Sequence, residues 1–106
     1  MTSIEDGPAK GQTFMLKRAP LLLRVVESDG TWDALDQLDD LPNPWEKIYA
    51  YERVGDVGQV HINAGRSAGH GWYTMASYRF VPDQPTDAEM RDPEKWQAWC
   101  WKMKGK

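Results

Sequence analysis

The chain has 106 residues, a formal net charge of −3 and 41% hydrophobic residues, with six tryptophans and one cysteine. These values indicate one globular domain, and they exclude a disordered chain and an internal disulfide framework. The negative charge also argues against nucleic-acid binding through a broad basic surface. The sequence shows no secretory leader and no apolar run of about 20 residues, the length of a membrane span. We therefore expect a cytoplasmic protein without membrane contact.

The first part of the chain predicts a flexible start followed by β-strands. Residues 1–6 are polar, and we expect them to be loose before a β-sheet that occupies residues 7–81. A turn at Gly7–Gly11 is expected because Gly and Pro favour the backbone angles of tight turns. The segment Gln12–Arg18 then predicts a strand that ends before a proline, and the apolar segment Leu21–Glu27 predicts a central strand.

A turn signal at Ser28–Gly30 follows this central strand. Because an Asp-Gly turn after a strand favours a hairpin, we predict a returning strand over Thr31–Gln37. A short helix is the open alternative for this segment, since Trp32, Leu35 and Leu38 recur at helical spacing.

The middle of the chain predicts two further strands joined by turns. Asp39–Pro44 is rich in proline and turn formers and indicates a loop. Glu46–Val54 alternates in polarity as a strand does, and Asp56–Gly58 is expected to turn the chain into a short strand over Gln59–Asn63. The Gly-rich segment Ala64–His70 indicates a flexible hairpin connection to the next strand.

The densest strand-forming run is Gly71–Val81, and the sheet is expected to form around it. Successive side chains of a strand point to opposite faces, so one face of this run is expected to belong to the core. That face carries Trp72, Thr74, Ala76, Tyr78 and Phe80. The opposite face is expected to be half exposed.

The C-terminal part predicts a hinge and then a helix. Residues 82–92 are expected to form the hinge and a short helical turn. Within them, Thr86 and Glu89 have the spacing of a capping box. Residues 93–104 predict a helix whose apolar residues form one stripe: Trp96, Trp99, Cys100 and Met103. We expect this stripe to cover the core face of Gly71–Val81. The elements together predict an α+β fold, a mainly antiparallel sheet of about five or six strands with a C-terminal helix packed on one face.

Residues that could bind a metal or catalyse a reaction do not form a known pattern. The histidines His61 and His70 and the thiol of Cys100 lack the close pairing of zinc ligands. The acidic residues from Asp33 to Asp39 do not have the spacing of a calcium loop. No nucleophile motif surrounds a serine or the cysteine, and Cys100 on the helix stripe is expected to be a small buried hydrophobe. We therefore expect neither an enzyme nor a cofactor.

The glycine-rich loop Gly65–Gly71 raises an alternative, the binding of a nucleotide or another anion by Arg66 and His70. The loop lacks the lysine and hydroxyl residue of a Walker motif and precedes a strand rather than a helix. A plain hairpin loop is the favoured interpretation.

The surplus of aromatic residues is the feature with most functional content. Some aromatic residues fall outside the expected core stripes, and aromatic and arginine side chains are enriched at protein interfaces. The candidate partner-binding residues are Trp45, Tyr49, Tyr51, Arg53, Arg66 and His70. The alternative is that a second small cluster buries these aromatics. Stacking of single-stranded nucleic acid on them is disfavoured by the negative net charge.

Three segments resemble small accessory proteins, without an assigned activity, carried by actinobacterial phages of the mycobacteriophage type. They are Asp6–Gln12, Trp32–Tyr51, and Tyr78–Val81 with its continuation to Cys100. The resemblance implies a non-catalytic protein-interaction module in the cytoplasm of a host cell, which binds a host or phage protein. A minor structural component of the phage particle is the alternative that it implies. Self-association as a homo-oligomer is compatible with either function.

Overall fold

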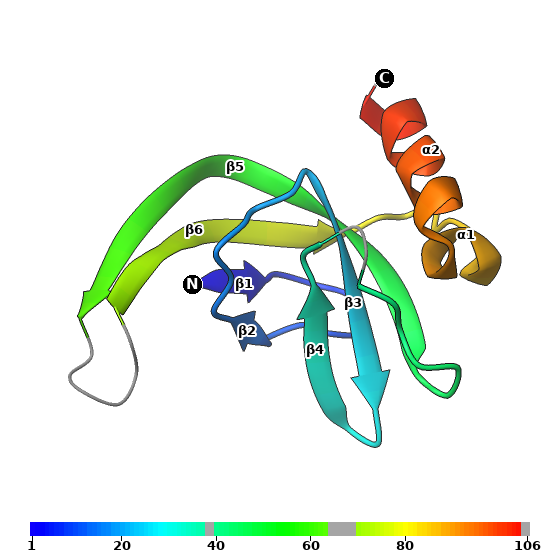
Figure 1. The fold of residues 1–106 in the computed structure, drawn as a ribbon, viewed down its shortest axis with the longest axis horizontal. Coiled ribbons are helices and arrows are strands. Elements are labelled where there is room, and N and C mark those ends of the chain that lie inside the picture. Colours follow the sequence, from blue (N-terminus) through cyan, green and yellow to red (C-terminus); the bar gives the residue numbers. More distant parts are fainter. Residues whose placement is uncertain (38–39, 64–69, 105–106) are drawn as a thin grey trace.

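A computed structural model of the protein shows a six-stranded sheet with a helical C-terminal part (Figure 1). It describes residues 1–37, 40–63 and 70–104, and for residues 60–63 and 70–72 it describes the backbone only. The elements are β1 Thr2–Ile4, β2 Thr13–Phe14, β3 Leu22–Ser28, β4 Thr31–Leu35, β5 Lys47–Asn63, β6 His70–Phe80, α1 Asp87–Arg91 and α2 Pro93–Lys104. Mostly antiparallel strands followed by helices make this an α+β arrangement at the coarse level.

The sheet has the strand order β2-β1-β6-β5-β3-β4 and curls strongly, so that it is nearly barrel-shaped (Figure 1). Its one parallel pairing among the described residues joins β1 to β6, where Thr2 lies opposite Ala76. The expectation that residues 1–6 are loose is therefore wrong, since β1 pairs on both sides and buries Ile4. A parallel pairing across most of the chain leaves no mark in the local pattern of residues 1–6. The strand expected over Gln12–Arg18 is shorter than predicted, since β2 spans only Thr13–Phe14.

The β3–β4 hairpin confirms the predicted returning strand, which ends at Leu35 instead of Gln37, and excludes the helical alternative. Asp29 and Gly30 form the connection with φ values of 50° and 81°, and Ser28 pairs with Thr31. Two consecutive positive φ angles characterise the tight hairpin turn whose twist matches that of the flanking strands.

The β5 strand continues through the segment Asp56–Gly58, where we expected a turn. Instead of ending before Asp56–Gly58, β5 continues with an irregular register between Val54 and Gly58. Gly55 has a φ of 72° there. Because glycine adopts positive φ angles easily, it can form the bulge at which the strand bends and then continues. Beyond the bulge, β5 pairs antiparallel with β6 up to Asn63 and His70, as predicted. This end of the hairpin extends away from the rest of the molecule (Figure 1).

Hydrophobic residues pack on both faces of the sheet. Inside the curl, β3, β5 and β6 bury Leu23, Val25, Tyr51 and Tyr78 together with Ile4, Ala9 and Leu16 of the N-terminal segment. This segment is held there by two buried hydroxyl groups. The Tyr51 hydroxyl accepts a hydrogen bond from the Ala9 N–H (2.9 Å), and the Tyr78 hydroxyl donates one to the Pro20 carbonyl (2.6 Å).

The helices cover the other face, which corrects the expected position of the C-terminal helix. Trp96 and Trp99 of α2 and Met90 of α1 are buried with Leu22, Val26, Ile48, Ala50 and Val81. Tyr78 and Phe80, the residues that we expected under the helix, belong to the cluster inside the curl. The prediction failed because the N-terminal segment already covers that face. The apolar stripe of α2 therefore packs against the other face of the sheet, which carries Leu22, Val26 and Ile48.

The link from β6 to α1 positions the helices on this face. The Gln84 side-chain amide makes hydrogen bonds to both the N–H and the carbonyl of Ala50, each 2.8 Å long. Thr86 and Glu89 form the predicted capping box at the start of α1. Within the described residues, neither helix is long and apolar enough to cross a lipid bilayer.

Candidate functional site

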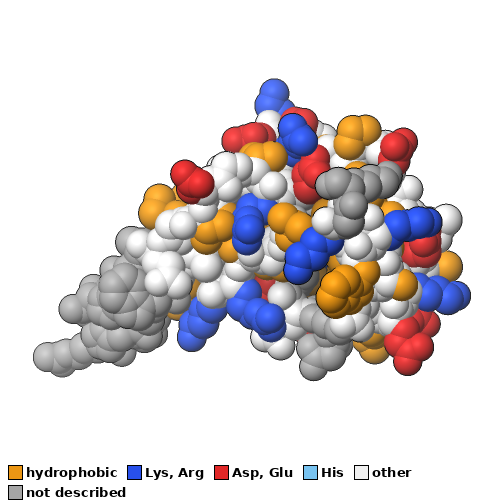
Figure 2. All heavy atoms as spheres, turned by 90° about the horizontal axis from the view of Figure 1, so that it is seen from above, with side chains coloured by type: hydrophobic (Ala, Val, Ile, Leu, Met, Phe, Trp, Pro, Cys, Tyr) orange, Lys and Arg blue, Asp and Glu red, His pale blue; other side chains and the backbone are white. Residues whose placement is uncertain are grey.

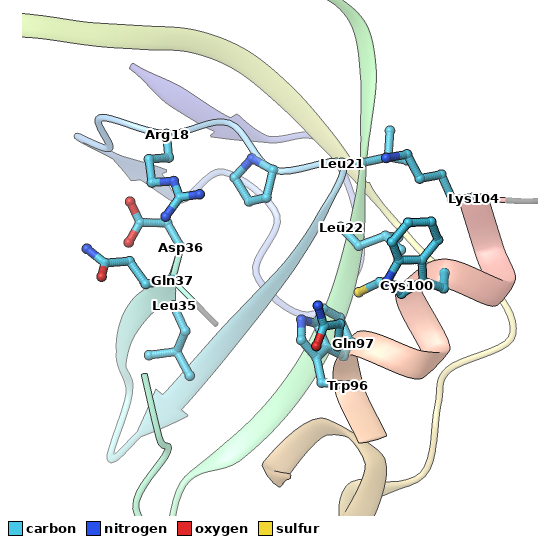
Figure 3. A pocket seen from close by; sticks show the side chains of 12 residues that line it. Arg18, Leu21, Leu22, Leu35, Asp36, Gln37, Trp96, Gln97, Cys100 and Lys104 are labelled. Carbon is cyan, nitrogen blue, oxygen red and sulfur yellow. The ribbon is translucent and has the colours of Figure 1, made fainter. Parts of the chain in front are cut away.

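A pocket of about 400 Å³ opens between α2 and the ends of β3 and β4 (Figure 3). Its apolar lining comes from Pro20, Leu21, Leu22, Leu35, Trp96, Cys100 and Trp101. Its polar lining comes from Arg18, Asp36, Gln37, Gln97 and Lys104. The volume lies within the range of about 300–1,000 Å³ that is typical of ligand pockets.

The indole of Trp96 in the pocket wall is held by groups on other elements. It stacks on Trp99 with ring centroids 5.2 Å apart and an interplanar angle of 22°. The guanidinium of Arg24 lies 5.4 Å from the centre of the Trp96 ring, a distance at which a cation is attracted to the ring face. These contacts hold Trp96 in this position in the pocket wall.

Arg24 also fixes the opposite wall. It is 1% exposed, and its two terminal nitrogens donate to the carbonyls of Met90 (3.1 Å) and Gln37 (2.9 Å). Burial lowers the pKa of Arg24 below its usual value, yet a guanidinium stays protonated in proteins. Arg24 thereby joins the end of α1 and the segment after β4 beside α2.

Two large hydrophobic side chains at the pocket remain partly in solvent. Leu21 is 40% exposed and Trp101 is 67% exposed. The ammonium group of Lys104 lies 5.6 Å from the centre of the Trp101 ring. Trp101 thus combines an exposed apolar ring with a cation at the edge of an apolar pocket, a mixture that is frequent at protein interfaces.

Charged side chains border the pocket on opposite sides. Arg18 and Asp36 lie together on the side of β4, and Lys104 lies on the side of α2 (Figure 3). On the face of the molecule seen in Figure 2, lysine and arginine, aspartate and glutamate, and hydrophobic side chains are interspersed. The surroundings therefore suit an apolar group that is flanked by polar or charged atoms.

The pocket offers no activated nucleophile. Burial raises the pKa of Cys100 to about 11, so its sulfur is a neutral thiol at physiological pH and not the reactive thiolate. Among the residues that the structure describes, no three His, Cys, Asp or Glu side chains converge to hold a metal ion. The arrangement can bind an apolar group.

Three of the predicted partner-binding residues do not form the exposed patch that we expected. Tyr51 is completely buried, and Tyr49 packs against Trp32 and Phe80 at ring distances of 6.0 and 6.3 Å. Arg53 donates to the Ala19 carbonyl (2.6 Å). Tyr51 belongs to the cluster inside the curl and Tyr49 is partly buried against that same cluster, so these two tyrosines pack in the core instead of forming a surface patch.

Trp45 is exposed as predicted, but it lies apart from the pocket. It is 71% exposed on a turn in which the Glu46 N–H donates to the Asn43 carbonyl (3.0 Å). Arg91 of α1 donates to the Asn43 carbonyl (2.9 Å) and to the Glu46 carbonyl. Trp45 is therefore a second exposed aromatic group on a well-held turn.

The remaining candidates fall outside the described side chains. Arg66 and most of the Gly65–Gly71 loop lie outside the described residues, and His70 is described as the first backbone position of β6.

The pocket residues Leu21, Arg18 and Lys104 were missed by sequence reasoning. The available signal was Trp101, an aromatic residue off the apolar stripe of its helix. Comparison with family models, with curated proteins and with solved structures found no match.

Proposed function

We propose that the protein is a non-catalytic protein-interaction module that docks a partner in the pocket between α2 and the ends of β3 and β4. The observation that carries this proposal is the exposure of Leu21 and Trp101 at a pocket with an apolar lining. Desolvation of such side chains by a partner is favourable, and interface energy concentrates on aromatic anchors beside pockets. In keeping with the sequence resemblance, the partner in this proposal is a host or phage protein.

The packing of Trp96 in the pocket wall supports docking further. Trp96 is fixed between Arg24 and Trp99, so a partner would meet a preformed surface and lose little free energy in ordering it. The raised pKa of Cys100 favours binding over chemistry at this place.

Affinity capture from host lysate tests the proposal. We expect the double variant Leu21→Ser, Trp101→Ala to lose the partners that the unchanged protein recovers, because it removes both exposed anchors. Trp45→Ala is the matched control, since it removes an exposed indole outside the pocket. Equal recovery by the double variant, or loss on Trp45→Ala alone, would place the docking surface elsewhere.

A further inference from the structure

The geometry points to a partner class for this pocket: we propose that it takes an acidic peptide segment with a bulky apolar anchor, supplied by another protein. The inference rests on the proposed function and names the chemistry of its partner. The anchor would enter the pocket, and carboxylates on either side of it would meet the cations at the mouth.

The shape of the pocket supports the anchor. Leu22, Leu35 and Trp96 form apolar walls around about 400 Å³, enough for a large aliphatic or aromatic side chain. Trp101 and Leu21 extend the apolar surface to the mouth, where they are accessible to residues beside the anchor.

The charges at the mouth support the acidic flanks. Arg18 and Lys104 stand on opposite sides of the pocket with one carboxylate, that of Asp36, among the lining residues (Figure 3). The guanidinium of Arg24 near the Trp96 ring is buried, and the carboxylate of Asp40 acts on its charge, so Arg24 does not add to the charge at the mouth. The lining residues thus carry two cations against one carboxylate in a chain whose net charge is −3, and a segment complementary to this excess is negative.

The neighbouring sheet edge favours recognition through side chains over addition of a strand. β4 is the terminal strand of the sheet beside the pocket, and an unpaired edge is a common site of strand addition. Here the N–H of Ala34 already donates to the carboxylate of Asp33 (2.8 Å). That donor is occupied, which weakens the edge as a backbone partner.

A pair of labelled synthetic peptides tests the proposal by fluorescence anisotropy with the full chain. Both contain a central Leu-Trp-Leu, and they differ only in flanks of three glutamates or three lysines. At about 50 mM salt we expect the glutamate peptide to bind about tenfold more tightly, and the difference to shrink at about 500 mM because exposed charges are screened. The double variant Arg18→Glu, Lys104→Glu should reverse the preference.

The matched control is Lys95→Glu, Lys102→Glu, which makes the same change in net charge on exposed positions of α2 that do not line the pocket. This variant should keep the preference for the glutamate peptide. Equal binding of both peptides, or the same reversal in the control, would overturn the proposal.

If neither peptide binds but Leu21→Ser, Trp101→Ala still abolishes partner capture, the acidic partner is wrong and the proposed function stands. A second copy as the occupant would also overturn it, and would appear in sedimentation as a dimer that the same double variant disrupts.

Discussion

At the scale of single residues, Arg24 is the side chain on which the helical face most depends. Its guanidinium pairs two backbone carbonyls and faces the ring of Trp96. Arg24→Met keeps a long apolar stem but leaves the carbonyls of Met90 and Gln37 without this donor. We expect a loss of about 1–3 kcal/mol in the free energy of unfolding, the usual cost of unpaired buried polar groups.

Urea denaturation measures this loss, and Lys47→Met at the exposed first position of β5 serves as the control. Arg24→Lys should lie between the two, because a single ammonium cannot reproduce the fork of a guanidinium. A midpoint for Arg24→Met equal to that of the unchanged protein would show that the buried guanidinium contributes nothing net.

Cys100 gives the stability of the protein an alkaline limit. Burial raises the pKa of its thiol to about 11 from an ordinary value of 9.0. The unfolded chain therefore loses this proton first, and the contribution of the neutral thiol, complete below about pH 9, is lost as the pH rises to about 11. We expect a loss of about 1–2 kcal/mol over this window. Burial also raises the pKa of Tyr51 and Tyr78, so the decline continues at higher pH.

Chemical unfolding at a series of pH values checks this prediction with Cys100→Ala as the comparison. The substitution lowers stability at every pH because it removes a partly buried side chain. The test therefore compares how steeply the free energy of unfolding falls with pH, not its absolute value. Between pH 9 and 10, where the tyrosines contribute least, the variant should show a flatter decline. Parallel curves would mean that the thiol titrates alike in the folded and unfolded chains.

At the scale of elements, the parts that the sequence predicted are those with local causes. The hairpin at Asp29–Gly30, the capping box at Thr86 and the helix α2 each depend on residues within a few positions of one another. The strand β1 and the face that α2 covers depend on packing between distant segments, which period and propensity do not report.

The candidate site divides in the same way. Trp45 was a candidate because it falls outside the expected core stripes, and it is exposed, whereas the burial of Tyr51 follows from the curl of the whole sheet. In β5, Ile48 and Ala50 belong to one cluster and Tyr51 to the other, so the alternation of the strand did not show which face, if either, is exposed to solvent. The pocket joins the start of β3, the end of β4 and α2, and no local pattern connects them.

At the scale of the whole molecule, one curved sheet separates two hydrophobic clusters with different covers. The N-terminal segment closes the inside of the curl, and α1 and α2 close the outside. Both clusters draw on β3 and β5, since alternate residues of each strand enter one cluster or the other. Loss of either cover therefore exposes one face of the strands that carry the opposite cluster, and the two should unfold together.

Removal of residues 93–106 tests this coupling. Two buried tryptophans would be lost at about 3–5 kcal/mol each, against a total stability of about 5–15 kcal/mol for a domain. We expect the shortened chain to lose its cooperative thermal transition in near-ultraviolet circular dichroism and to aggregate through the uncovered face of Leu22, Val26 and Ile48. Trp101→Ala, which removes an exposed indole from the same helix, should keep a cooperative transition. A shortened chain that stays monomeric and melts cooperatively would show that the cluster inside the curl is sufficient on its own, because the sheet would then fold without the helical cover.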